Sequence, residues 1–253
     1  MTVKELYDIL NSRIPTSLSC DWDNDGLMCC PDNDREVKKV LVTLDITDKA
    51  ISKAIEEECD LIVAHHPLIF KGIKSLASEN AVQKRTIKLI KNSIAAFSFH
   101  TRLDALEGGV NDRLAKLIGI SDASPFGEEG IGRIGTVENA LTADEFAAHV
   151  KERLSAPSVI LADAGKKVKR VAVLGGGGSD DIQAAITAGA DTFVSGDLSY
   201  HAMVDAAEEE MNLIAAGHFF TEFPVCEVLS DLIGDADSTI ERIIFFSNEI
   251  KTI

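Results

Sequence analysis

Two stretches of the chain, 131 residues apart, carry the same succession of apolar strand, helix and apolar strand. Lys38–Val42 reads K-K-V-L-V and matches K-R-V-A-V at Lys169–Val173. Cys59–Ala64 reads C-D-L-I-V-A and matches A-D-T-F-V-S at Ala190–Ser195 at the same offset. Both copies read as a βαβ unit, so the repeat predicts two α/β lobes of similar topology. The alternative is convergence, because Val, Ile and Ala are common in any such strand.

The rest of the chain also alternates between strand and helix patterns. The β-branched run Lys39–Ile46 predicts a strand, and an apolar stripe predicts a helix over Val3–Arg13. T-A-D-E at Thr142–Glu145 is a capping box that predicts the start of another helix. This alternation predicts an α/β fold with largely parallel strands.

A third apolar run extends the repeat and helps to divide the chain. S-I-A-A from Ser93 matches L-I-A-A from Leu213 at an offset of 120 residues. Turn-forming residues at Ser121–Glu129 indicate the boundary between the lobes. We therefore expect an N-terminal lobe over residues 1–125, a C-terminal lobe over residues 126–235, and a closing strand within residues 236–253 that can return to the N-terminal lobe.

Charge and composition exclude several classes of protein. The formal net charge of −16 disfavours nucleic acid and anionic membranes as partners. No apolar run approaches the roughly 18 residues of a membrane span, and the start M-T-V-K-E-L-Y-D lacks the apolar block of a signal peptide. The five cysteines include no C-x-x-C pair, which predicts reduced thiols in a cytoplasmic protein and no cysteine metal site.

Histidines gather where predicted strands end. In open α/β sheets, ligands bind beyond the carboxyl ends of the strands. Four of the six histidines take such positions, and two of them precede a carboxylate by four residues, which places both groups on one face of a helical turn. The residues are His65 and His66 in D-L-I-V-A-H-H-P, His100 with Asp104 in H-T-R-L-D, and His218 with Glu222 in H-F-F-T-E. One such histidine alone would be read as structural, but this combination predicts a metal site.

The adjacent pair His65 and His66 favours two metal ions over one. Neighbouring residues on an extended backbone point to opposite sides, so each imidazole would bind its own ion, with the ions about 3.5–4 Å apart. Glu222 has the reach to bridge them, while Asp104 and His218 would complete the two ligand shells. Imidazole and carboxylate ligands suit Zn, Mn, Fe or Ni. The four positive charges of two divalent ions exceed the two negative charges of the carboxylates, which favours a bound hydroxide or an anionic substrate.

Six motifs in this order resemble one known family. They are D-W-D-N-D-G-L at Asp21–Leu27, A-H-H-P at Ala64–Pro67, H-T-R-L-D and E-G-G-V-N-D within His100–Asp112, S-G-D-L-S-Y-H at Ser195–His201, and G-H-F-F-T-E at Gly217–Glu222. The chain is similar, essentially end to end, to the Nif-three-like family of dinuclear-metal proteins, also labelled GTP cyclohydrolase I type 2 homologues.

The resemblance carries its own expectations. It implies two divalent metal ions bound by His65, His66, Asp104, His218 and Glu222. It also implies a two-lobed α/β fold with the metal site in the cleft, and assembly into a ring-shaped homohexamer, a trimer of dimers.

Other conspicuous residues allow two interpretations each. His100 could orient a metal ligand or carry a proton, and we take it as a catalytic candidate. His201, four residues after Asp197, is the second catalytic candidate, with a surface histidine as the alternative. Gly175–Asp181 reads as a tight turn rather than a phosphate loop, since it lacks the P-loop lysine. Trp22 lies in a turn or lines the cleft.

These residues together predict a metal-dependent hydrolase that uses a metal-activated water. The candidate substrates are phosphoesters, cyclic amidines such as a purine ring, and peptides, and a small anionic or nucleotide-like molecule fits the charge. Aromatic residues make up 6% of the chain, which argues against a base-stacking pocket. The alternatives are a non-catalytic metal-binding scaffold or regulatory hexamer and a ring that clamps DNA, the latter disfavoured by the acidic balance.

Overall fold

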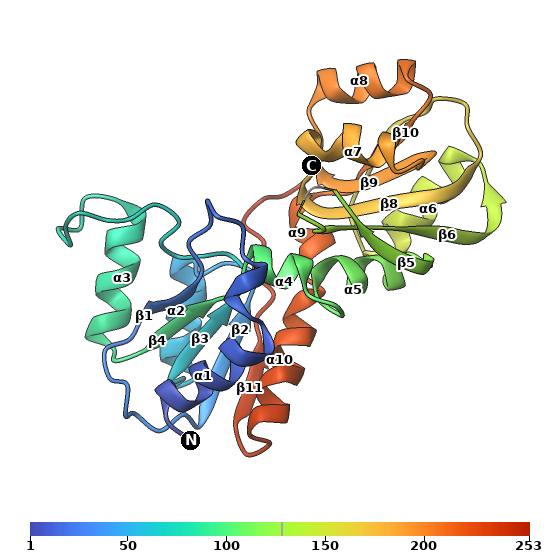
Figure 1. Ribbon diagram of the computed structural model, residues 1–253. Coiled ribbons are helices and arrows are strands. Elements are labelled where there is room, and N and C mark those ends of the chain that lie inside the picture. The colour runs from blue at the N-terminus through green and yellow to red at the C-terminus, as the bar shows by residue number, and fades with distance from the viewer. Residues whose placement is uncertain (128) are drawn as a thin grey trace. The chain divides into compact units, whose positions relative to one another are not determined.

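The computed structural model describes residues 1–127 and 129–253 and contains two compact α/β units. Unit 1 combines Met1–Leu103 with Val225–Glu249, and unit 2 combines Asp104–Pro224 with Ile250–Ile253 (Figure 1). The α/β class expected from the sequence is confirmed. Within the described residues, no helix has the length and apolar character needed to cross a bilayer.

A five-stranded sheet in the order β1-β4-β3-β2-β11 forms the centre of unit 1. Its strands are β1 (Gly26–Cys29), β2 (Lys39–Thr43), β3 (Leu61–Ala64), β4 (Ala95–Ser98) and β11 (Glu241–Ile244). The strands from β4 to β11 run parallel, and β1 pairs antiparallel at the edge. β3 and β4 are buried along their whole length, as strands covered by helices on both faces must be.

Two pairs of helices cover the two faces of this sheet (Figure 1). They are α1 (Val3–Arg13) with α10 (Val225–Ala236), and α2 (Asp48–Glu56) with α3 (Ala81–Lys91); a short 3-10 turn follows α1 at Thr16–Leu18. Leu41 and Ile62 share a buried cluster with Leu89 of α3. On the other face, the rings of Tyr7 and Phe97 lie 5.1 Å apart. The helix expected over Val3–Arg13 is confirmed, and a capping box at Thr2 begins it.

Unit 2 has a six-stranded sheet in the order β5-β6-β8-β9-β10-β7. Its strands are β5 (Ser121–Phe126), β6 (Gly132–Leu141), β7 (Ile160–Ala162), β8 (Val168–Gly177), β9 (Thr192–Asp197) and β10 (Asn212–Ala215). β8, β9 and β10 are parallel, while β5, β6 and β7 pair antiparallel with their neighbours. The expectation of largely parallel strands is therefore wrong for half of this sheet. Glu128, in the expected boundary segment, lies outside the described residues.

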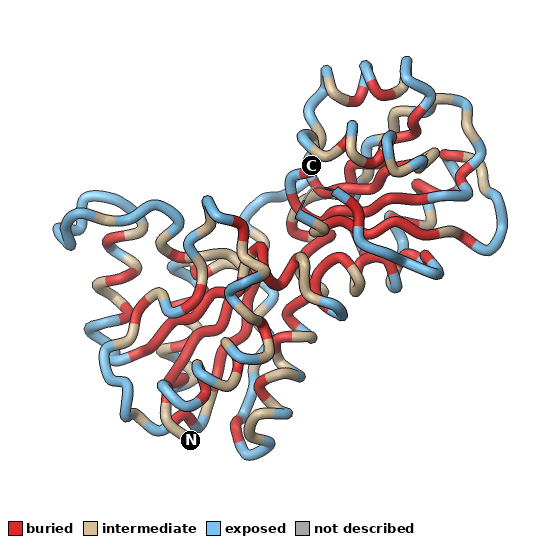
Figure 2. Tube along the Cα trace, viewed as in Figure 1, coloured by how far each residue is buried: buried red, intermediate tan, exposed pale blue. Residues whose placement is uncertain are grey.

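Successive residues of the strands in unit 2 point to opposite faces of the sheet, and different helices pack against each face. The elements are α5 (Val110–Leu117), α6 (Ala143–Arg153), α7 (Ile182–Thr187), α8 (Tyr200–Glu208) and a 3-10 turn at Ser179–Asp181. Val171 and Val173 of β8 pack with α5 and α6, whereas Ala172 and Leu174 pack with α7 and α8. Figure 2 shows the resulting buried strands beneath exposed helix surfaces. The capping box predicted at Thr142 is present and begins α6.

Hydrogen bonds reproduce the predicted repeat at atomic detail. The carboxylate of Asp60 accepts hydrogen bonds from the backbone N–H groups of Lys38–Lys39. The carboxylate of Asp191, 131 residues later, accepts hydrogen bonds from the backbone N–H groups of Lys169–Arg170. Both aspartates precede the second strand of a parallel β-α-β-α-β segment, which supports an internal duplication.

The third strands correspond at a different offset from the one expected. Leu61 pairs with Ala95 in unit 1 and Thr192 pairs with Asn212 in unit 2, so the offset is 117 residues, from 95 to 212. The offset of 120 is wrong because short runs of Ile and Ala match one another in several registers. At 117, the short helix α4 (Thr101–Ala105) after β4 coincides with α9 (His218–Glu222) after β10.

Candidate functional site

His65 and His66 follow directly after β3, at the carboxyl end of the parallel strands of unit 1. The strand ends at Ala64, so the alternation of an extended backbone does not continue and the two rings lie 5.0 Å apart. His65 is buried, and its Nδ1 donates to the carbonyl oxygen of Phe99 at 2.9 Å. His66 Nδ1 donates to the carboxylate of Asp45 at 2.8 Å. One ring is therefore held from the β4 side and the other from the β2 side.

His100 joins the same group of rings from the end of β4. One ring nitrogen from each of His65, His66 and His100 lies within 4.8 Å of the others. The Nδ1 of His100 donates to Asp23 at 3.0 Å, and the other oxygen of that carboxylate accepts from the Thr101 backbone and hydroxyl. Burial opposes ionisation of Asp23, but the hydrogen bonds from His100 and Thr101 outweigh it and hold its pKa well below its usual range.

His218 and Glu222 form the corresponding group in unit 2. They begin and end α9, and His218 Nε2 lies 3.0 Å from the Glu222 carboxylate, as the four-residue spacing predicts. Glu222 is buried. His218 Nδ1 donates to Asp197, the last residue of β9, at 2.8 Å.

Glycines allow the backbone of unit 2 to close tightly around this pair. A Cβ atom at Gly176, where φ is +70°, would lie 2.1 Å from the Glu222 carboxylate oxygen and 3.2 Å from His218 Nε2. A Cβ atom at Gly196 would lie 2.7 Å from the Cα atom of His218. Gly175–Gly177 thus end β8 and pack against the two side chains, and the turn expected in this segment is the 3-10 turn at Ser179–Asp181.

The remaining predicted residues are spread over other elements. Asp104 is buried in α4, where its backbone carbonyl accepts from Asn111 Nδ2 at 3.4 Å. His201 is exposed in the first turn of α8, with its ring 5.4 Å from that of Tyr200. At the end of the glycine-rich segment, burial and the neighbouring acids raise the pKa of Asp181, which argues further against an anion site there.

The aspartates that orient the histidines are the functional residues that sequence reasoning missed or left ambiguous. Asp45 comes two residues after β2, Asp197 closes β9, and Asp23 lies in the turn before β1. A search for carboxylates at strand ends, applied as it was to histidines, would have found Asp45 and Asp197. Asp23 offers no such signal, because aspartate is common in turns.

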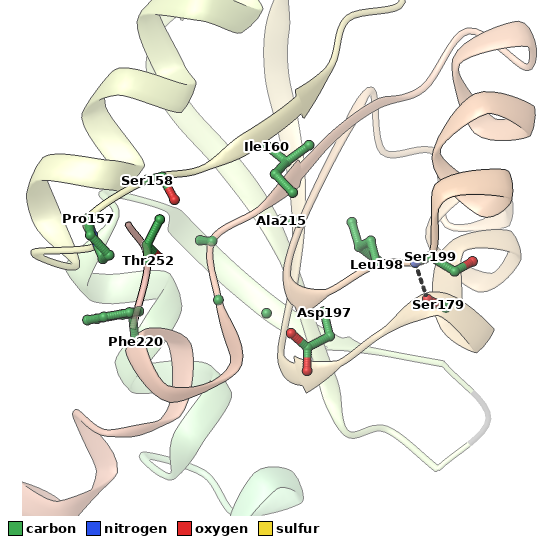
Figure 3. Close-up of a pocket in the computed structure, with 13 residues that line it drawn as sticks. Pro157, Ser158, Ile160, Ser179, Asp197, Leu198, Ser199, Ala215, Phe220 and Thr252 are labelled. Carbon is green, nitrogen blue, oxygen red and sulfur yellow. Dashed lines mark hydrogen bonds between the residues drawn. The ribbon is translucent and has the colours of Figure 1, made fainter. Parts of the chain in front are cut away.

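A cavity of about 480 Å³ lies in unit 2 beside the carboxylate of Asp197. Figure 3 shows Asp197 between Leu198 and Ser199 on one side and Phe220 on the other, with Ile160 at the far end. This volume falls within the range of pockets that hold small molecules, roughly 300–1,000 Å³. The cavity therefore offers room for a ligand next to the group that orients His218.

Comparison with known proteins now decides the family. A family model described as Duf34/NIF3 (NGG1p interacting factor 3) matches residues 1–252. The chain belongs to the Duf34/NIF3 family. This finding confirms the resemblance drawn from the six motifs.

Relatives of this NIF3 chain match along nearly its whole length. A protein of Clostridium acetobutylicum named GTP cyclohydrolase 1 type 2 homolog is 36% identical over 238 residues, covering 91% of this chain and 88% of its own. A Clostridium perfringens protein of the same name is 33% identical, covering 99% and 98%. Among solved structures, Staphylococcus aureus protein SA1388 superposes with a TM-score of 0.90 at 30% identity, covering 100% and 99% of the two chains. Reduced HcgD from Methanocaldococcus jannaschii gives a TM-score of 0.84 at 29% identity, covering 96% and 97%.

The donor atoms of this NIF3 chain suit metal ions. Nδ1 of four histidines donates to a carbonyl or carboxylate oxygen: His65, His66, His100 and His218. These acceptors carry no proton to give, so the proton is on Nδ1, and Nε2 of His65, His66 and His100 carries the lone pair of the neutral ring. His218 Nε2 lies 3.0 Å from the Glu222 carboxylate, so a proton or a metal ion must lie between these two atoms. Histidine ligands of metals are typically held through their other nitrogen in this way. His149 differs, since its Nε2 contacts the Ile118 carbonyl.

Proposed function

We propose that this NIF3 protein binds two divalent metal ions and hydrolyses a small anionic substrate. The proposed ligands are those that the sequence predicted: His65, His66, Asp104, His218 and Glu222. The observation that carries the proposal is the common arrangement of the histidines in both units, each oriented through Nδ1 by an oxygen acceptor. A histidine that binds a metal almost always donates its other ring N–H to such an acceptor, whereas a structural histidine has no need of this shared arrangement.

Each proposed ligand has a distinct part in this arrangement. Glu222 would bridge the two ions, because it is buried and already lies within 3.0 Å of the His218 imidazole. His65 and His66 would contribute one imidazole each, and Asp104 would balance charge with a second carboxylate. Bound ions of this type polarise a substrate bond and lower the pKa of a coordinated water towards neutrality.

His100 is the residue that we assign to proton transfer. Its hydrogen bond to Asp23 fixes the proton on Nδ1, so Nε2 is the atom that would accept a proton from water or pass one to a leaving group. Its ring centroid lies 5.3 Å from that of His65 and 5.7 Å from that of His66, which places it beside the proposed ligands of unit 1. His201 remains the second candidate for proton transfer.

The substrate class is proposed from charge and from the relatives' names. Two divalent ions with two carboxylates and neutral imidazoles leave a net positive charge, which favours an anion. Relatives at 36% and 33% identity carry the name GTP cyclohydrolase 1 type 2 homolog. A phosphoester or a cyclic amidine within a nucleotide-like molecule is the substrate that we propose.

Metal content tests the ligand assignment. Elemental analysis of Glu222→Gln should give half the metal of the unaltered protein or less, with the circular dichroism spectrum unchanged. Glu208→Gln on the exposed face of α8 is the matched control and should keep full stoichiometry. Equal metal content in both variants would refute the bridging role of Glu222.

Turnover is tested separately from binding. Protein restored with each of Zn, Mn, Fe and Ni is screened against phosphoesters, nucleotides and peptides. Metal-dependent release of product that disappears in His100→Ala would support the proposal. Full metal binding with no turnover on any substrate would instead leave a metal-binding scaffold. Size measurement in solution tests the proposed hexamer, which would contain six chains of 27.2 kDa each.

A further inference from the structure

A group of three aromatic rings lies on unit 1 beside His65 and His66; two of the rings are exposed and the third is half-buried. Trp22, Phe70 and His100 form a near-equilateral triangle, with centroid separations of 6.1, 6.3 and 6.2 Å and steep interplanar angles of 68°, 77° and 88°. Trp22 is 58% exposed and Phe70 is 44% exposed. We call these three residues the aromatic shelf. The low aromatic content of the chain argues against a stacking surface, but the fold gathers its one tryptophan into such a surface.

Polar contacts of neighbouring residues hold the shelf in place. Asp23, next to Trp22, accepts hydrogen bonds from His100 Nδ1 at 3.0 Å and from the Thr101 hydroxyl at 2.6 Å. Asp25 accepts from the Arg102 guanidinium at 2.9 Å. Asn24 donates from its side chain to the carbonyl oxygen of Ile69, the residue before Phe70.

The two loops that carry the exposed rings are therefore tied to each other and to the end of β4. A surface that is ordered before a ligand arrives loses little conformational entropy on binding. An exposed tryptophan held so firmly is consistent with a binding role, because packing alone would bury the ring.

One residue of the shelf, His100, also lies beside the proposed metal ligands of unit 1. His100 lies in the triangle, and its ring centroid is 5.7 Å from that of His66. A planar ring stacked on Trp22 would therefore lie close to the imidazoles of unit 1. This continuity distinguishes the shelf from other exposed aromatics such as Tyr200, which lies on α8 in unit 2.

The loop that carries Phe70 is basic in a chain that is strongly acidic overall, whereas the loop that carries Trp22 contains Asp21, Asp23 and Asp25. The segment Pro67–Ser78 contains Lys71 and Lys74 and no aspartate or glutamate, although the whole chain carries −16. Both lysines are exposed, and Lys71 directly follows Phe70. Lysines attract phosphate groups as mobile point charges. Asp23 and Asp25 are paired with His100 and Arg102, so aromatic rings with two exposed lysines on one side match a ligand with a flat heterocycle and a phosphate.

We propose that the aromatic shelf binds the base of a mononucleotide, with the phosphate near Lys71 and Lys74. This proposal specifies the substrate class of the hydrolase proposed above, and its relevance to catalysis rests on that function. Binding of the mononucleotide does not itself require turnover. Stacking a base on an aromatic side chain strengthens binding by about tenfold or more. The lysines add a contribution that depends on salt.

The single tryptophan makes the test direct. Because Trp22 is the one tryptophan in the chain, its fluorescence reports on the shelf alone. Guanosine monophosphate should quench it saturably in the metal-loaded protein, whereas ribose 5-phosphate, which lacks the base, should not. N-acetyltryptophanamide controls for light absorbed by the purine. Phe70→Leu should weaken binding about tenfold without loss of metal, while Tyr200→Leu, which removes an exposed ring elsewhere, should bind as the unaltered protein does.

A second pair of variants guards against misfolding of the shelf. Lys71→Ala with Lys74→Ala changes only exposed side chains and should remove the difference in affinity between guanosine monophosphate and guanosine. No saturable quenching, equal quenching by ribose 5-phosphate, or equal binding by Phe70→Leu and Tyr200→Leu would overturn the proposal. A change of emission on diluting the protein alone would also overturn it, by showing that a second copy covers the shelf. Quenching without any hydrolysis would refute the hydrolase and leave the shelf standing, whereas hydrolysis of another substrate without quenching would refute the shelf alone.

Discussion

Substituting alanine for Gly176 should remove metal from the protein while leaving it folded. The new Cβ atom would lie 2.1 Å from the Glu222 carboxylate oxygen, so this oxygen must retreat by about 0.9 Å to reach even a 3.0 Å contact. Functional metal–ligand distances vary by only about 0.2 Å. The displacement is several times larger, so Glu222 would be lost as a ligand and metal affinity should fall at least tenfold.

The same substitution has a calculable effect on stability. Gly176 adopts φ of +70°, where an L-residue with a Cβ atom costs about 1–2 kcal/mol. For a protein of this size each kcal/mol lowers the Tm by roughly 2–4 °C, so the expected loss is about 2–8 °C. Metal titration followed by calorimetry and a thermal melt of the metal-free protein would measure the two effects independently.

Gly189→Ala provides a matched control within the same unit. Gly189 has φ of +81°, but the atom nearest to its added Cβ is Arg170 Nε at 3.9 Å, an ordinary contact. This variant should lose a similar Tm and keep its metal. If Gly176→Ala binds metal as tightly as Gly189→Ala does, then Glu222 is not a metal ligand and the reasoning fails.

Three further predictions concern single side chains. Asp197→Ala should weaken metal binding about tenfold, as measured by isothermal titration, because Asp197 orients His218. This is the lower end of the usual effect of losing such a partner, since the Asp197 side chain is 66% exposed and water can replace it. Asp60→Asn should cost about 2 kcal/mol at neutral pH, since Asp60 accepts charged and backbone hydrogen bonds from Arg35 and Lys38. Burial opposes ionisation of Asp60, but these bonds lower its pKa. The stability that the ionised carboxylate contributes is therefore lost as the pH falls below about 3.9, so urea melts should show the unaltered protein and Asp60→Asn becoming more alike in stability, and not less. His201→Ala should keep both metals but lose turnover, and loss of metal by elemental analysis would show that His201 is a ligand.

Local patterns predicted the parts of the fold that depend on local sequence. The apolar stripe of α1 and the capping box at Thr142 are local signals, and the structure contains both of these features. Strand β5 is different, because Ser121–Phe126 is exposed over most of its length and contains serine and proline, so nothing in it alternates. Its hydrogen bonds to β6 hold it as a strand, and such pairing is invisible in the segment itself.

The candidate site was similarly predictable only in part. The histidines and carboxylates stood out because strand ends in α/β folds collect functional residues. Asp23 did not, since it looks like an ordinary turn residue until its hydrogen bond to His100 is known. Asp45 lies at a strand end as the histidines do, but only the structure shows that it holds His66. The aromatic shelf depends on Trp22 and Phe70, which are far apart in sequence and meet only through the fold.

The pairing of β11 with β2 bears on how the protein is made. β2 ends at Thr43 and its partner begins at Glu241, so nearly two hundred residues are translated between them. At about 5–20 residues per second, this delay is on the order of 10–40 seconds, during which one edge of β2 lacks its neighbour. Unpaired strand edges recruit other chains, so nascent protein at the ribosome is most exposed to aggregation in this interval. All strands of unit 2 are synthesised during this interval. β2, the first strand of the β-α-β-α-β segment of unit 1, is therefore among the last strands to gain both of its neighbours.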